Sequence, residues 1–196
     1  MGPRKAGTKA PARAPVRLDS VGDMRTLIVV ESHWGNTEDI AHAIAEGLAG
    51  SGRVDVVRVD DAPSDVTGVD LLLVGGPTHA FSMSRPQTRD DAQRQGATAL
   101  SGTGVREWLA RIDASARATQ VALFDTKVAV MRHLPGSAAM AAARVVRSAG
   151  IPLTQRPTSF YVEGTEGPLL PGELARARAW GAAFVAPSVP LHVGVA

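Results

Sequence analysis

The chain has 196 residues, of which 44% are hydrophobic, and its formal net charge is +2. This length predicts one well-buried domain, and no apolar run approaches the roughly 20 residues needed to span a bilayer. Because the chain has no cysteine, disulfides, thiolate metal sites and cysteine nucleophiles are excluded, and we expect a cytoplasmic location.

The positive charge is concentrated at the N-terminus. The first 17 residues contain five basic residues and no acidic residue, whereas the remaining 16 basic and 19 acidic residues give a net charge of −3. We therefore predict a disordered basic arm over residues 1–24, a folded domain over 25–186 and a tail over 187–196. The arm lacks the apolar core of a signal peptide. It also has no aromatic residue among its charges, so we do not expect it to bind nucleic acid.

Apolar strand-like runs alternate along the chain with segments of helical spacing. The predicted strands are residues 25–31, 54–59, 70–75, 120–125 and 157–163. The predicted helices are residues 36–49, 87–95, 104–112, 137–148 and 171–185. The run at 54–59 alternates enough to indicate a half-exposed edge strand. The order predicts an α/β fold, a three-layer sandwich with a five-stranded parallel sheet.

Three irregular segments follow predicted strands: residues 32–37, 76–86 and 125–135. In doubly wound sheets the carboxyl ends of the strands share one edge, and ligands bind in the crevice there. We therefore expect the three segments to converge on one crevice.

The first of these segments predicts an anion site. Ser32, Asn36 and Thr37 supply small hydrogen-bonding groups, and Gly35 allows a sharp turn into the helix that follows. The amides and dipole of a helix N-terminus favour a phosphate group. The same residue types also form ordinary helix caps with no ligand, so this alternative stays open.

Other phosphate-binding motifs are missing from the chain. A dinucleotide fingerprint needs GxGxxG after the first strand, and a P-loop needs GxxxxGK[ST]. Neither pattern occurs, because Gly35 is the single glycine of the first turn. Receiver domains need an acidic residue at the end of the third strand, where this chain has Gly75 and Gly76.

The remaining pattern resembles the flavodoxin family. Ser32-x-x-Gly35-Asn36-Thr37 is similar to the flavodoxin phosphate loop, whose usual pattern is [TS]-x-[TS]-G-x-T. Gly75-Gly76-Pro77-Thr78, followed by an aromatic residue, resembles the second flavin loop, and Asp125-Thr126 has the position of the third. The resemblance extends over residues 26–186.

This resemblance implies a non-covalently bound FMN. Ser32, Thr37 and the amides of residues 35–37 would hold the phosphate, and Phe81 would stack on the flavin ring. The implied cofactor-binding residues are Ser32, His33, Trp34, Gly35, Asn36, Thr37, Pro77, Thr78, His79, Ala80, Phe81, Asp125, Thr126 and Lys127. No catalytic side chain and no metal are implied.

Two departures from the family pattern affect the prediction. Trp34 stands where a phosphate-binding hydroxyl is expected, and we interpret it as a lid on the loop or as a subunit contact in a homodimer. The third loop has no aromatic residue, which predicts an open flavin face with room for a substrate. His33, His79 and His133 fall in the three loops. They could contact flavin or substrate or bind a metal, although exposed loop histidines are common.

The predicted function is electron transfer to a redox partner protein or a small-molecule electron acceptor. Two alternatives remain. One is an FMN-dependent NAD(P)H:quinone-type or protoporphyrinogen-type oxidoreductase. The other is a flavodoxin-fold binding module that has lost its flavin.

Overall fold

The computed structural model describes residues 23–99, 101–112 and 114–185. Most of the predicted basic arm and the whole predicted tail lie outside these residues. The strands are β1 (Met24–Val30), β2 (Gly52–Arg58), β3 (Leu71–Pro77), β4 (Gln120–Val128) and β5 (Thr158–Val162). The helices are α1 (Asn36–Gly47), α2 (Pro86–Arg94), α3 (Val105–Leu109), α4 (Ala138–Ser148) and α5 (Glu173–Ala182). Two short 3₁₀ helices are η1 (Ala114–Arg117) and η2 (Ala129–Met131).

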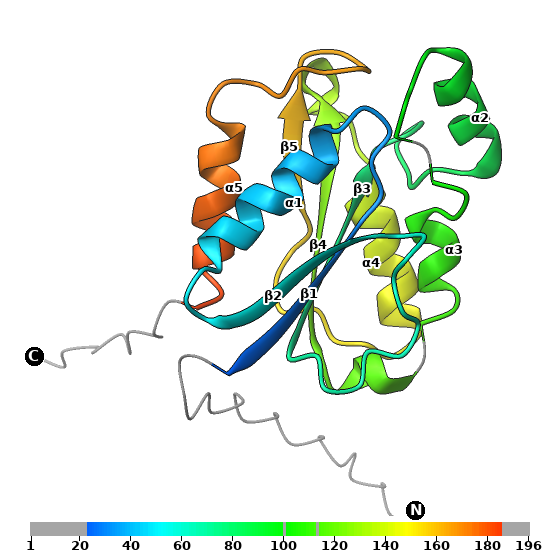
Figure 1. Cartoon of the computed structure of the whole chain (residues 1–196). Coiled ribbons are helices and arrows are strands. Elements are labelled where there is room, and N and C mark those ends of the chain that lie inside the picture. The colour runs from blue at the N-terminus through cyan, green and yellow to red at the C-terminus, as the bar shows by residue number, and fades with distance from the viewer. Residues whose placement is uncertain (1–22, 100, 113, 186–196) are drawn as a thin grey trace, which may run out of the picture.

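The five strands form one parallel sheet in the order β2-β1-β3-β4-β5. Helices α1 and α5 cover one face, and α3 and α4 cover the other (Figure 1). This arrangement confirms the predicted fold class, and β2 is an edge strand as predicted. Because β2 and β3 lie on opposite sides of β1, the strand order reverses between β1 and β3, which is the topological switch point of the sheet.

The apolar runs of the strands are continuous because both faces of the sheet are covered. In β1, Leu27 and Val29 pack into the core on the α3 and α4 side, whereas Ile28 and Val30 pack into the core on the α1 and α5 side. Side chains alternate along a strand, so each strand contributes to two cores. Burial of each such side chain stabilises the fold by roughly 1.5–3 kcal/mol.

Helices α1 and α5 contact each other through glycine. A Cβ atom added to Gly47 would lie 2.1 Å from the carbonyl oxygen of Arg178, and one added to Gly181 would lie 2.3 Å from that of Ile44. Neither site accepts a side chain without a shift of backbone. This close contact fixes α1 against α5, and α1 begins at the carboxyl edge of the sheet because it directly follows β1.

Two strands continue further than the sequence predicts. β3 extends from the predicted end at Gly75 to Pro77, and β4 extends from Asp125 to Val128. The reason is pairing, because Gly76 and Pro77 lie beside Asp125 and Thr126. Most predicted helices differ from the structure by one or two residues at their ends, but α3 and α5 are shorter. Within the described part of the chain, no helix is long and apolar enough to cross a membrane.

Candidate functional site

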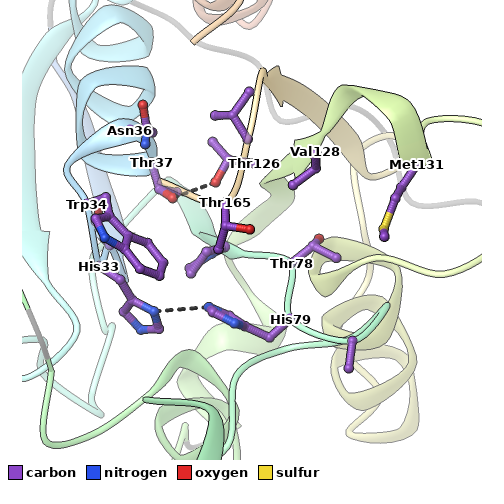
Figure 2. Close-up of a pocket in the computed structure, with 14 residues that line it drawn as sticks. His33, Trp34, Asn36, Thr37, Thr78, His79, Thr126, Val128, Met131 and Thr165 are labelled. Atoms are coloured by element: carbon purple, nitrogen blue, oxygen red, sulfur yellow. Dashed lines mark hydrogen bonds between the residues drawn. The ribbon is translucent and has the colours of Figure 1, made fainter. Parts of the chain in front are cut away.

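A cavity of about 210 Å³ lies at the carboxyl edge of the sheet and opens to solvent. It collects residues from the ends of β1, β3, β4 and β5 (Figure 2). Its lining consists of Ser32, His33, Trp34, Asn36, Thr37, Pro77, Thr78, His79, Ala80, Thr126, Val128, Met131, Val162 and Thr165. The three segments that the sequence predicts to converge therefore meet at one place, together with the segment after β5.

The β1–α1 loop delivers an uncapped helix N-terminus to this cavity. Gly35 precedes α1 in the left-handed conformation, with φ 87° and ψ −28°, which glycine adopts without strain. No side chain caps the helix, and Ser32 Oγ accepts one long hydrogen bond of 3.4 Å from the Glu38 amide. The amides of Asn36 and Thr37 have no acceptor among the described residues. Two donors at the positive end of the helix dipole thus remain available to a ligand.

Two polar side chains of α1 tie the loop to neighbouring elements. Thr37 Oγ1 lies 2.7 Å from Thr126 Oγ1 of β4, and both residues are buried. Asn36 Nδ2 donates to the carbonyl oxygen of Glu166 at 2.8 Å, which holds the segment after β5 against the start of α1. These contacts place the hydroxyl and amide groups of α1 at a fixed position beside the cavity.

The segment after β3 makes a tight turn. His79 and Ser82 exchange two backbone hydrogen bonds of 2.9 Å. The two residues between them, Ala80 and Phe81, have positive φ values of 45° and 62°, a conformation that costs energy in residues other than glycine. Phe81 is 42% exposed and does not line the cavity. The aromatic residue that does is Trp34.

Strand alternation separates the three predicted residues at the end of β4. Thr126 faces the cavity, as does Val128 two residues later. Asp125 and Lys127 are buried outside the lining. Asp125 Oδ2 accepts a hydrogen bond of 2.7 Å from the Ala139 amide at the start of α4, and burial raises the pKa of this carboxyl group. Lys127 Nζ donates to the carbonyl oxygens of Leu134 and Gly136 at 2.8 and 3.0 Å.

The three loop histidines separate into a hydrogen-bonded pair, in which His33 is buried and His79 is half-buried, and an exposed residue, His133. His79 Nε2 lies 3.0 Å from His33 Nδ1, and His33 Nε2 lies 3.0 Å from Glu31 Oε1. His133 contacts its neighbour Arg132 and is exposed outside the cavity lining. In the described residues no group of three or more histidine or acidic side chains is placed to hold a metal ion.

The pKa values of His79 and Glu31 are both shifted from their usual range. Burial and the nearby His33 lower the pKa of His79 to about 4. For Glu31, burial alone would raise the pKa, but hydrogen bonds from His33, Ser84 and the Val105 amide outweigh it and hold the pKa below its usual value. Glu31 is therefore an ionised carboxylate in contact with a histidine pair, and His79 is neutral at physiological pH.

Several residues of the site were not predicted from the sequence. Val128, Met131, Val162 and Thr165 line the cavity, and Glu31 contacts the lining residue His33. A signal existed for Thr165, because the fifth parallel strand must end at the same edge as the others. A signal also existed for Glu31, which is a charged residue directly after a buried apolar run.

The family model and the similar solved structures are all flavodoxins. The family model described as flavodoxin matches residues 28–109. Flavodoxin 2 from Bacillus cereus is similar with a TM-score of 0.61 and 16% identity, over 82% of this chain and 97% of that chain. A flavodoxin from the domain Archaea gives a TM-score of 0.56 and 18% identity, over 82% and 95% of the two chains.

A third similar structure is the two-electron reduced flavodoxin of Megasphaera elsdenii. It gives a TM-score of 0.53 and 22% identity, over 81% of this chain and 98% of that chain. No curated protein matches the sequence. At these identities the solved structures establish that the fold is shared, over nearly the whole length of each flavodoxin.

Proposed function

We infer that this chain, a flavodoxin-like protein, binds FMN without a covalent bond and carries electrons. In doubly wound sheets ligands bind at the switch point, and flavodoxin is itself a known case of this rule, with FMN at the switch point between β1 and β3. The observation that carries the inference is the uncapped N-terminus of α1, which opens into the cavity at that switch point with two unpaired amides.

The residues around this helix end fit a phosphate group. The amides of Asn36 and Thr37 would donate to the phosphate, together with the hydroxyl groups of Ser32 and Thr37. Among the residues that the structure describes, no lysine or arginine side chain lines the cavity. Backbone donors at a helix N-terminus bind a dianion without a basic side chain, so the absence of basic residues agrees with the family's way of holding FMN.

The rest of the cavity fits a flat, largely apolar ring. Trp34 lies on the β1 side, and Met131 lies across the pocket on the segment after β4 (Figure 2). Trp34 would offer an aromatic face to the flavin, and its place in the cavity lining supports a contact with the cofactor. Bound FMN supplies the redox chemistry, and the protein supplies orientation and a polarity that sets the potential.

The side of the cavity beside Met131 is where an electron donor or acceptor would approach. Met131 is 42% exposed, and Val130 and Leu134 nearby on the same segment are also exposed. A redox partner protein or a small-molecule acceptor could reach the flavin there. A cytoplasmic location belongs to the same proposal and agrees with a chain that has no cysteine.

Absorbance and titration test this proposal. We expect the purified protein to show flavin absorbance bands, or the flavin-free protein to quench the fluorescence of added FMN. Riboflavin, which lacks the phosphate, is the matched probe and should bind at least about tenfold more weakly, because two or more phosphate hydrogen bonds are lost. A colourless protein that quenches neither compound would overturn the proposal. Equal affinity for both would place the phosphate away from α1.

A second candidate function is an FMN-dependent oxidoreductase of the quinone or protoporphyrinogen type. The open side beside Met131 favours it, because a substrate could lie there against the flavin. Stopped-flow mixing of the FMN-loaded protein with NADH or NADPH separates the two functions. Rapid flavin reduction without a partner protein indicates the oxidoreductase, whereas reduction that needs a partner protein indicates a carrier.

A further inference from the structure

A hydrogen-bonded chain of side chains connects the cavity to the protein interior, from the half-buried His79 to the buried His33 and Glu31. His79 lines the cavity, and its Nε2 lies 3.0 Å from His33 Nδ1 (Figure 2). His33 Nε2 in turn lies 3.0 Å from Glu31 Oε1. Glu31 and His33 are 1% exposed. A buried charge needs hydrogen-bond partners to offset its lost hydration. The buried Glu31 carboxylate must therefore be surrounded by donors.

The carboxylate end of the chain is fully hydrogen-bonded. Glu31 Oε1 accepts hydrogen bonds from His33 and from the hydroxyl of Ser84. Glu31 Oε2 accepts a hydrogen bond of 2.8 Å from the amide of Val105 at the start of α3. These donors stabilise the ionised form. Glu31 thus provides a fixed negative charge beside His33.

Other charged groups near the chain have hydrogen-bond partners of their own. Arg89 of α2 donates to Ser84 Oγ at 3.1 Å and to Glu107 of α3 at 3.2 Å. Arg106 of α3 donates to the carbonyl oxygens of Met83 and Ser84.

On the other side, Arg58 of β2 pairs with Glu38 of α1 at 3.1 Å. Arg58 also donates to the carbonyl oxygen of Ala99, whose amide donates to the carbonyl oxygen of His33. Besides burial, Arg89 contributes to the lowered pKa of His79. Glu31 is the carboxylate that contacts the histidine pair directly, through His33.

The ring nitrogens of the two histidines allow the chain to hold one additional proton. With both rings neutral, His33 donates to Glu31 from Nε2 and accepts at Nδ1 from His79 Nε2. Among the described residues none forms a hydrogen bond with His79 Nδ1, which therefore has a free lone pair.

A proton that binds His79 Nδ1 lets His79 pass its Nε2 proton to His33 Nδ1. Both hydrogen bonds remain, with one reversed in direction. The positive charge then resides on His33, next to the Glu31 carboxylate.

Electrostatics favours this location of the extra proton. Burial opposes a charge on His79, and its pKa is lowered to about 4. A charge on His33 lies 3.0 Å from Glu31 Oε1 and is stabilised by it. His79 accordingly acts as the entry, and His33 as the place where the proton stays.

We propose that Glu31, His33 and His79 form a proton relay that takes up one solvent proton when the group in the cavity gains an electron. The proposal rests on the proposed function, because FMN is the group that gains the electron. An external donor supplies the electron, and the proton enters from solvent at His79 Nδ1 and leaves His33 protonated. No bond to the flavin forms in the relay step, the added charges cancel, and oxidation releases the same proton.

The first test counts protons. We compare three FMN-loaded proteins, the wild type, His79→Gln and the control His133→Gln. Each is photoreduced in weakly buffered solution, and a pH-indicator dye reports the protons taken up. Glutamine can still donate to His33 but cannot transfer a proton. We expect wild type and the control to take up as much as one proton more per FMN than His79→Gln. Equal proton counts in all three proteins would overturn the relay while leaving FMN binding intact.

The reduction potential gives a second readout of the same coupling. Uptake of one proton per electron changes a potential by about 59 mV for each tenfold change in proton concentration. We expect the potential of the wild type to depend more steeply on pH than that of His79→Gln, with the His133→Gln control equal to wild type. Parallel pH profiles would contradict the relay.

Nitrogen-15 NMR of the histidine rings tests the relay without flavin. In flavin-free protein at alkaline pH we expect both His33 and His79 to carry their proton on Nε2. A proton on Nδ1 of neutral His33 would overturn the predicted hydrogen-bond direction. Failure to bind FMN would instead overturn the proposed function, and the redox coupling with it, while the NMR result would still decide whether the chain is built as described.

Discussion

The two sides of the cavity differ in how firmly they are held. On the β1 side, Ser32, His33 and Thr37 are buried and each makes a side-chain hydrogen bond. On the other side, the segment after β4 exposes apolar side chains, with Val130 82% exposed and Leu134 48% exposed. The comparison indicates a division of roles. The polar, fixed side is suited to hold a cofactor, and the apolar, open side is suited to meet another molecule.

The largest effect is expected at the fixed side, in the buried carboxylate network. Glu31→Ala removes the acceptor of His33, Ser84 and the Val105 amide and leaves three buried donors unpaired. We expect the free energy of unfolding to fall by about 3–5 kcal/mol, measured by urea denaturation.

The control for this prediction is Glu46→Ala, which breaks an exposed ion pair with Arg178. Exposed pairs contribute about 0–1 kcal/mol. If both substitutions lower the free energy of unfolding equally, the hydrogen bonds of Glu31 stabilise the protein no more than a surface ion pair does. The contrast between the two sides of the cavity is then lost.

The same side should also determine the pH dependence of stability. The pKa of His79 falls from 6.5 in the unfolded chain to about 4 in the folded protein. Between these values the unfolded chain binds a proton that the folded protein does not, so stability must fall as the pH drops from 6.5 to 4. With allowance for the partial exposure of the ring, the loss amounts to about 2 kcal/mol.

Urea denaturation at a series of pH values checks this prediction. We expect His79→Gln to lose less stability than wild type across the window. His42→Gln, which changes an exposed residue of α1, should follow the wild-type curve. Identical curves for wild type and His79→Gln would mean that His79 titrates as it does in water.

On the open side, one buried lysine holds the segment after β4 in place. Lys127→Met removes two charged-donor hydrogen bonds to the carbonyl oxygens of Leu134 and Gly136. We expect a loss of about 2 kcal/mol, with faster amide hydrogen exchange over residues 129–136 as the measurement. Exchange should stay slow in the exposed control Arg144→Met. Uniformly faster exchange across the sheet would show that Lys127 supports the whole fold instead of this segment.

FMN affinity offers a direct comparison of the two sides. Thr37→Val removes a hydroxyl that we place on the phosphate, and it should weaken FMN binding by about 1–2 kcal/mol. Met131→Ala on the open side should change affinity by less than about threefold, because its side chain is partly exposed without the ligand.

Two threonine variants separate the phosphate contact from general packing. Thr126→Val breaks the same 2.7 Å pair but keeps the Thr37 hydroxyl, and Thr26→Val removes a buried hydroxyl without a hydrogen-bond partner. The Thr26→Val protein should bind FMN as wild type does. If Thr37→Val also binds FMN normally, the phosphate does not contact this hydroxyl.

The parts of the fold that could be predicted are those with local signals. The alternation of Leu27 to Val30 between two cores makes an unbroken apolar run, and Gly35 before Asn36 marks a turn into a helix. The extra residues of β3 and β4 have no such signal. Thr126 is a strand residue because it pairs with Pro77 on one side and Phe160 on the other, and neither neighbour is visible from the residues around it.

The same distinction applies to the site. The phosphate-loop residues are contiguous, so their spacing identifies them. The network beneath the cavity joins Glu31 to Ser84, 53 residues later, and to the Val105 amide, 74 residues later. Three-dimensional packing creates this network. The position of Glu31 after an apolar run is a local signal, but nothing in the sequence near it points to Ser84 or to the Val105 amide. Phe81, predicted to stack on the flavin from its position after β3, is 42% exposed and is not among the residues that line the cavity.

The smallest expected effect concerns the turn that carries His79 at the boundary between the two sides. Ala80 has a φ of 45°, where an L-residue costs roughly 1–2 kcal/mol relative to glycine. Ala80→Gly relieves this cost but increases the entropy of the unfolded chain, so we expect a net gain of about 1 kcal/mol in the free energy of unfolding. Ala175→Gly in α5 should instead lose about 1 kcal/mol.

Opposite signs for these two alanine-to-glycine changes would establish that the turn is held under strain beside the cavity. The fixed side would then include the turn, since only a rigid surrounding keeps a strained backbone in place. If Ala80→Gly destabilises the protein as much as Ala175→Gly does, the turn carries no strain. His79 would then be positioned by its hydrogen bond to His33 alone. The fixed side of the cavity would end with β3, and the turn after β3 would not belong to it.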